Sequence, residues 1–248
     1  MKDIHVKELS IKDRLMQVEE QFRIWEATGD KAAREKTGEE IRFITISRDY
    51  GCAGFRIGDS LASALNSKQQ EGLAPWTVYD HKLVDLVCKN HKLNRVLVES
   101  LDNQSKHVFG DYIKGIFTGE PSSIQVFKKC AETIFQLASK GRVIIIGRAS
   151  CLVTAKLSGG LHIRIVAPLE WRIKQVAAYE NIADPKEARS YVVKNDRERG
   201  KFAKYFLGRS LKTPTLYDMI MNQQRFGVEG IVNLTLGAMQ LRAQMRKS

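Results

Sequence analysis

The segment that most constrains the fold is residues 41–59, IRFITISRDYGCAGFRIGD. An alternating apolar run comes before a turn that carries Gly51, Gly54 and Gly58, and an amphipathic stretch follows. This order predicts a β-strand, a glycine-rich loop and a helix whose first N–H groups face an anion. The phosphate-loop pattern GxxxxGK[ST] cannot be matched there, so the rest of the chain has to indicate what the loop binds.

Strand patterns recur at residues 76–79, 142–146, 161–167 and 217–222, and helical patterns separate them. The run RVIII at 142–146 is almost continuously β-branched, which is typical of a parallel strand buried on both faces. Strands that alternate with helices predict a parallel sheet covered by helices on both sides, joined by right-handed crossovers.

Residues 2–34 form a separate pattern before this core. Their apolar positions are Ile4, Ile11, Leu15, Val18, Phe22 and Trp25. Steps of three and four predict a long amphipathic helix with one narrow apolar seam. Two alternatives stay open: the helix packs on its own domain, or its seam pairs with a second copy or another partner.

Composition excludes several classes of protein. A chain of 248 residues with 43% hydrophobic residues can bury a good core, and no apolar run approaches the roughly 20 residues that span a bilayer. No signal-peptide pattern opens the sequence, so we expect a cytoplasmic protein. The four cysteines show no CxxC spacing, which argues against a zinc site or a disulfide framework. Cys52 lies in the glycine-rich loop at a helix start, where a lowered thiol pKa would make it reactive.

The net charge of +12 favours an acidic partner. The basic residues are spread along the chain, and several stand where a strand ends and a helix begins. Anions bind at such positions in α/β enzymes. An acidic small molecule therefore explains the pattern better than a nucleic acid, which remains a secondary possibility.

Six segments in register resemble the cytidylate kinase-like family, relatives of bacterial cytidylate kinases among the P-loop nucleoside monophosphate kinases. They are ITISRDYGCAGFRIG, VYDHKLV, VIIIGRAS, LHIRIVAPLEWRIKQV, NDRERGKFAKYF and YDMIMN, within about residues 41–240. The resemblance implies a three-layer α/β fold of the P-loop kinase type with a five-stranded parallel sheet. It also implies a helical insertion at about 81–140 that binds the monophosphate, and a helical lid at about 185–210. Residues 1–40 would then be an N-terminal helical extension of a domain at 41–248.

The same resemblance implies a phosphotransferase that uses ATP and Mg²⁺ to phosphorylate a (d)CMP-like acceptor. The alternative is a kinase-fold regulatory protein that binds a nucleotide or RNA with weak or no phosphotransfer. The missing loop lysine favours this alternative, whereas the retained arginines favour the kinase. No set of side chains predicts a metal site held by the protein alone. The acceptor base and its sugar are not predicted.

Aligned with the cytidylate kinase loop, the lysine position falls on Gly54, so Arg56 or Arg48 has to supply that charge. Arginine is always ionised and binds phosphate through a planar fork, in a shape that differs from a lysine ammonium. The predicted ATP-binding set is Arg48, Tyr50, Gly51, Cys52, Ala53, Gly54 and Arg56.

The predicted acceptor-binding residues are Asp80, Arg148 and Arg172. Asp80 follows the second strand, where it would bind the acceptor sugar or a magnesium-bound water, or cap the next helix. Arg148 matches the arginine of the GRD segment that holds the acceptor phosphate in cytidylate kinases, although Ala149 replaces the aspartate. Arg172 either reaches the nucleotide or is a solvated charge on a helix.

The lid pattern at residues 196–199, Asp-Arg-Glu-Arg, mixes acids and bases at helical spacing. Pairs within the helix are one reading. The resemblance favours Arg197 and Arg199 as clamps on the phosphoryl group in the transition state. With Arg56 and Arg148, these two arginines complete the predicted catalytic set.

Overall fold

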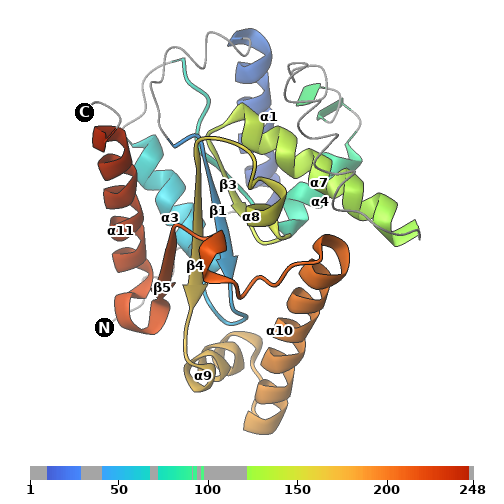
Figure 1. The fold of residues 1–248 in the computed structure, drawn as a ribbon, viewed down its shortest axis with the longest axis vertical. Coiled ribbons are helices and arrows are strands. Elements are labelled where there is room, and N and C mark those ends of the chain that lie inside the picture. The colour runs from blue at the N-terminus through green and yellow to red at the C-terminus, as the bar shows by residue number, and fades with distance from the viewer. Residues whose placement is uncertain are drawn as a thin grey trace.

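The computed structural model describes residues 10–28, 41–67, 72–90, 92–93, 96–97 and 122–245. Within these ranges the central sheet has five parallel strands (Figure 1). They are β1 (Phe43–Arg48), β2 (Thr77–Tyr79), β3 (Val143–Ile146), β4 (Gly160–Val166) and β5 (Met219–Asn222). The predicted five-stranded parallel sheet is confirmed, and its order across the sheet is β2-β3-β1-β4-β5.

Strand β1 is the middle of the sheet. Phe43 is opposite Val143 in β3 on one side and Gly160 in β4 on the other. Successive side chains of β1 enter opposite cores, because Phe43 packs in one apolar cluster and Ile44 in another. The carboxyl ends of all five strands meet at one edge, where ligands of open α/β sheets bind.

Helices cover both faces of the sheet (Figure 1). One face carries α3 (Gly54–Asn66) and α11 (Gln223–Met245), which is kinked at Gly227 with φ of 64°. On the other face lie α1 (Ile11–Thr28), α4 (His81–Lys89), α7 (Ser122–Lys140) and α8 (Ser150–Val153). The α/β kinase-like fold of the prediction is therefore confirmed, with helices on both sides of the parallel sheet.

Two helices lie beyond the carboxyl edge of the sheet, α9 (Leu169–Glu180) and α10 (Pro185–Leu207) (Figure 1). They pack on each other through a small cluster of Ile173, Val176, Ala188 and Val192. The carboxylate of Asp184 caps the start of α10, and a short 3-10 helix (Pro214–Leu216) follows before β5. Together, α9 and α10 cover the strand ends.

Helix α1 packs on its own domain, which was the first of the two alternatives. It starts with Ser10 and Asp13, because Asp13 N–H donates to Ser10 Oγ while the Asp13 carboxylate accepts from Ser10 N and Oγ. Its seam residues Val18, Phe22 and Trp25 are buried in the same core as β2 and β3. This part of the seam is therefore filled by the domain itself, whereas the seam residue Ile11 is exposed.

A buried glutamine fixes α1 against the sheet. Gln21 Nε2 donates to the carbonyl oxygens of Pro75 at 2.8 Å and Arg142 at 3.0 Å, and Gln21 Oε1 accepts from the Tyr79 hydroxyl at 2.6 Å. The apolar pattern of the sequence did not predict this contact.

The middle of the predicted insertion, residues 98–121, lies outside the described residues. The same holds for Ile4 of the α1 seam. Of the helices that are described, none combines the length and the apolar character needed to cross a membrane.

Candidate functional site

The glycine loop, residues 49–53, joins β1 to α3. Gly51 has φ of 88°, and a Cβ atom there would lie 3.0 Å from both the Cβ and the carbonyl oxygen of Arg172. A side chain at Gly51 is therefore excluded both by the left-handed backbone and by α9. Four of the five loop N–H groups already have acceptors. Asp49 N and Cys52 N donate to the backbone carbonyl oxygens of Ile165 and Asp49. Tyr50 N donates to Asp196 Oδ1 at 2.7 Å and Ala53 N donates to Gln223 Oε1 at 2.8 Å.

Arg48, the last residue of β1, runs under this loop. A Cβ atom on Gly54 would lie 2.9 Å from Arg48 Cδ, and one on Gly147 would collide with the guanidinium. Burial and the neighbouring Arg199 charge lower the pKa of Arg48 to about 9, which leaves it charged at neutral pH. No described carboxylate lies within ion-pair distance of it. By contrast, Arg56 is exposed on α3.

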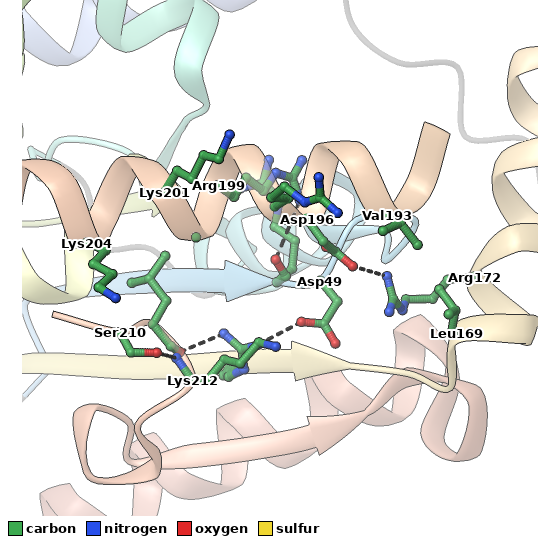
Figure 2. A pocket seen from close by; sticks show the side chains of 15 residues that line it. Asp49, Leu169, Arg172, Val193, Asp196, Arg199, Lys201, Lys204, Ser210 and Lys212 are labelled. Atoms are coloured by element: carbon green, nitrogen blue, oxygen red, sulfur yellow. Dashed lines mark hydrogen bonds and ion pairs between the residues drawn. The ribbon is translucent and has the colours of Figure 1, made fainter. Parts of the chain in front are cut away.

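A cavity of about 810 Å³ opens between the ends of β1 and β4 and helix α10 (Figure 2). Its charged lining residues are Arg48, Asp49, Arg164, Arg172, Asp196, Arg197, Arg199, Lys201, Lys204 and Lys212. The eight cationic side chains far outnumber the two carboxylates, so the cavity suits a polyanion.

Both carboxylates of the large cavity are held by arginines. Asp49 Oδ1 accepts from Arg164 Nη2 at 2.7 Å, and Asp196 Oδ2 accepts from Arg172 Nη1 at 2.7 Å, as the dashed lines of Figure 2 show. Burial raises the pKa of Asp49, and the Arg164 charge opposes that rise. Arg164 was not among the predicted site residues. Its charge inside a strand is the signal that could have identified it from the sequence.

Arg172 is a buried residue that holds the loop. Besides Asp196, its guanidinium donates to the carbonyl oxygens of Ala167 at 3.0 Å and Tyr50 at 2.9 Å. The alternative of a solvated helix charge is therefore wrong for this residue, because only 7% of it is exposed.

A smaller cavity of about 300 Å³ lies against the glycine loop and α9. Its lining beyond the loop includes Trp171, Tyr179, Gln223 and the predicted Arg56. Arg48 and Arg199 line both cavities, so the two spaces adjoin at these guanidinium groups.

The two predicted lid arginines both lie on α10 and line the large cavity. The Arg199 guanidinium stands 4.8 Å from the centroid of the Tyr50 ring, and its Nη1 is 3.5 Å from the Arg48 carbonyl oxygen. Burial lowers the pKa of Arg199, and Asp196 opposes this. Arg197 thus shares the cavity with Arg199. Among the described residues, neither arginine forms an ion pair within the helix, whereas Lys201 pairs with Glu198.

A second charged group lies at the ends of β2 and β3. Arg148 has φ of 51°, an uncommon value for a side-chain-bearing residue, and its Nη2 donates to Asp85 Oδ2 at 2.5 Å. Arg148 Nε is buried and has no hydrogen-bond partner. Asp80 caps α4 by accepting from Leu83 N at 3.0 Å, and it also forms an ion pair with Arg14 at 3.0 Å. The capping role of Asp80 is confirmed.

The prediction of a reactive Cys52 is wrong. Burial, with help from the Asp49 carboxylate, raises the pKa of this thiol to about 12. The N–H groups of Tyr50 and Ala53, on either side of it, donate to Asp196 and Gln223. Neither residue can be placed beside the loop from local sequence, since Gln223 is 170 positions from Ala53.

Comparisons with known proteins agree with this fold. The model of the "Cytidylate kinase-like family" matches residues 43–225. A curated relative named cytidylate kinase, from Staphylothermus marinus, is 25% identical over 120 residues, which cover 48% of this chain and 64% of the relative. The match thus spans less than two thirds of that relative's length.

A crystal structure of an uncharacterized protein from Eubacterium ventriosum shares the fold. It aligns with a TM-score of 0.60 and 16% sequence identity, over 82% of this chain and 99% of the other. At this identity the likeness concerns the fold alone.

Proposed function

The chain belongs to the cytidylate kinase-like family, and from this premise we propose that it transfers the γ-phosphoryl group of ATP to a (d)CMP-like nucleotide. The observation that carries the proposal is the cation-lined cavity of about 810 Å³ beside the glycine loop. Phosphoryl transfer brings several negative charges together, so it needs fixed cations and positioning more than it needs acid–base groups.

On the donor side, we assign the ATP phosphates to the glycine loop and Arg48. Arg48 takes the role of the missing lysine, because it is buried beside Gly54 and lacks a carboxylate partner among the described residues, whereas Arg56 is exposed. The smaller cavity would hold the donor base, with Trp171 and Tyr179 available for stacking.

On the acceptor side, Arg148 would hold the monophosphate. Its buried Nε without a partner and its half-buried position after Gly147 support this assignment. An acceptor phosphate oxygen then bonds to the γ-phosphorus as the bond to the β–γ bridging oxygen breaks, and ADP leaves. Arg197 and Arg199 on α10 would neutralise the charge on the phosphoryl oxygens during this step.

The described residues contain no group of three or more acidic, histidine or cysteine side chains that could hold a metal alone. Mg²⁺ in kinases is bound largely by substrate phosphates, so these residues fit an ion that the nucleotide brings with it. When bound, the ion would neutralise charge on the transferred group.

A coupled assay of ADP release across the nucleoside monophosphates tests the proposal, beside a thermal-shift screen of the same ligands. Turnover with CMP or dCMP is the expected result. Stabilisation by nucleotides without turnover would instead identify a binding protein.

The two loop arginines provide a sharper test. Arg48→Gln is expected to weaken ATP binding by about tenfold or more, because a buried charge-assisted contact is lost. Arg56→Gln, on the exposed face of α3, is the matched control with a smaller effect. The reverse order in calorimetric titrations would transfer the lysine's role to Arg56.

One observation favours the second candidate, a nucleotide-binding regulatory protein with little phosphotransfer. The Asp196 carboxylate accepts the Tyr50 N–H, so a negative side chain stands on the loop that would receive phosphates. Asp196 has to move before a phosphate can accept from this N–H group.

A further inference from the structure

Arg14 of α1 reaches the site from outside the family match, which begins at residue 43. Its Nη1 donates to Asp80 Oδ2 at 3.2 Å, and its Nη2 lies 3.0 Å from Asp80 Oδ1. The guanidinium carbon stands 4.4 Å from the centroid of the Phe55 ring, in the first turn after the glycine loop. Only 8% of Arg14 is exposed, so this contact is internal.

The placement of Arg14 is set by contacts on both sides of it. The Ser10–Asp13 cap fixes the helix start directly before it. Gln21 is on the same helix face, two turns or about 10 Å further along, and is bonded to the backbone at the sheet edge. Arg14 is thus held at the carboxyl end of β2 by the rigid docking of α1.

Arg14 satisfies a carboxylate that stands close to Arg48. Burial opposes ionisation of Asp80, but hydrogen bonds from Arg14 and from Leu83 N–H hold its pKa below the ordinary value, so it is a charged carboxylate. The Arg48 guanidinium reaches Gly147 at the end of β3, and Asp80 follows β2, the next strand of the sheet. Asp80 thus acts electrostatically on Arg48 without forming an ion pair with it. Both Asp80 oxygens are already occupied by the contacts of Arg14 and Leu83.

We propose that Arg14 is a positioning residue that binds Asp80 and thereby keeps the guanidinium of Arg48 available for phosphate. Without Arg14, Asp80 is a buried charge whose neighbouring cation is Arg48, and an ion pair between them would neutralise the loop. Helix α1 then contributes to the site through the charge of Arg14. This inference rests on the proposed function only where Arg48 is taken to bind nucleotide phosphates.

ATP titration of charge-balanced variants tests the proposal. Arg14→Gln is expected to weaken ATP binding by about tenfold, the size of one charge-assisted contact. Asp80→Asn in the Arg14→Gln background is expected to restore the affinity, because asparagine also caps a helix and carries no charge to pair with Arg48. Arg23→Gln is the control, since Arg23 is an exposed α1 arginine paired with Glu20 on the same helix.

A merely structural Arg14 would give a different result. Its loss would lower the melting temperature while the folded protein kept its ATP affinity, or the affinity would stay low in the double variant. Either outcome overturns the proposal. If Arg14→Gln does not fold, a second pair of variants replaces it. Arg14→Lys keeps a cation beside Asp80 and is expected to bind ATP more tightly than Arg14→Met, which is refolded at low temperature.

A stability cycle tests the same charge balance without any nucleotide. In the wild-type protein, Arg48→Gln is expected to raise the melting temperature, because it removes a buried guanidinium without a carboxylate partner. In the Arg14→Gln background, Arg48→Gln is expected to lower the melting temperature, because Arg48 then pairs with Asp80. Equal shifts in both backgrounds would refute the inference, whereas failure of ATP to bind the wild type would refute the proposed function.

Discussion

Cys52 has the most directly testable side chain. Because burial and Asp49 raise its pKa to about 12, the thiolate fraction at pH 8 is on the order of one in ten thousand. We expect Cys52 in the native protein to react with iodoacetamide far more slowly than a free cysteine. Its rate should climb as the pH rises toward 12, for as long as the protein stays folded.

Peptide-level mass spectrometry after timed alkylation measures this rate, with the urea-unfolded protein as the reference. Rapid labelling of Cys52 at pH 7 would mean that the loop does stabilise a thiolate.

At the level of single residues, local pattern points to some residues of the candidate site and misses others. Arg148 could be predicted because it directly follows a buried strand and a glycine. Arg14 and Gln223 could not, because each contacts the loop region across a long stretch of chain. Asp196 was visible as part of a charged helix, but its contact with Tyr50 N–H depends on how α10 docks.

At the scale of elements, α10 contacts the glycine loop through Asp196, which accepts from Tyr50 N–H. Asp196→Asn removes the negative charge that faces Tyr50 N–H and Arg172, so we expect ADP to bind several-fold more tightly. Calorimetric titration of ADP measures the change. Glu198→Gln, on the exposed side of the same helix beside Lys201, is the control and should leave the affinity unaltered.

Weaker ADP binding by Asp196→Asn would show that the carboxylate organises the loop through Arg172 more than it competes with phosphate.

Helix α1 should contribute strongly to stability through Gln21. Gln21→Ala leaves a cavity and deprives the buried Tyr79 hydroxyl of its acceptor, so we expect a loss of about 2 to 4 kcal/mol. Urea unfolding followed by circular dichroism measures the free energy of unfolding. Gln17→Ala, one turn earlier on the exposed face, should change it by less than about 0.5 kcal/mol.

A loss as small as that of the control would mean that α1 is only loosely attached to the sheet.

Strands and helix starts followed from the sequence because they depend on local chemistry. The β-branched run ending at Ile146 predicts a buried strand, and Pro185 after Asp184 predicts the start of α10. The docking of α1 did not follow, since its seam fits an internal core and a second helix equally well. The polar anchor Gln21, which decides between them, carries no apolar signal.

For the whole molecule, the net charge of +12 makes anion binding depend on salt. Raising KCl from about 50 to about 500 mM should weaken ATP binding, and it should weaken binding of a single-stranded RNA more, since more phosphates are involved. Fluorescence anisotropy with labelled RNA, beside ATP titrations, compares the two slopes.

RNA that still bound in the high-salt buffer and displaced ATP would make nucleic acid the main partner of the large cavity.

The central place of β1 has a consequence for the way this protein is made. Its partner in β3 lies about 100 residues later in the chain, and its partner in β4 lies later still. At a translation rate of roughly 5 to 20 residues per second, a ribosome exposes the apolar β1 segment for roughly 5 to 20 seconds before either neighbour emerges. The nascent chain is therefore expected to be a client of ribosome-associated chaperones during that interval.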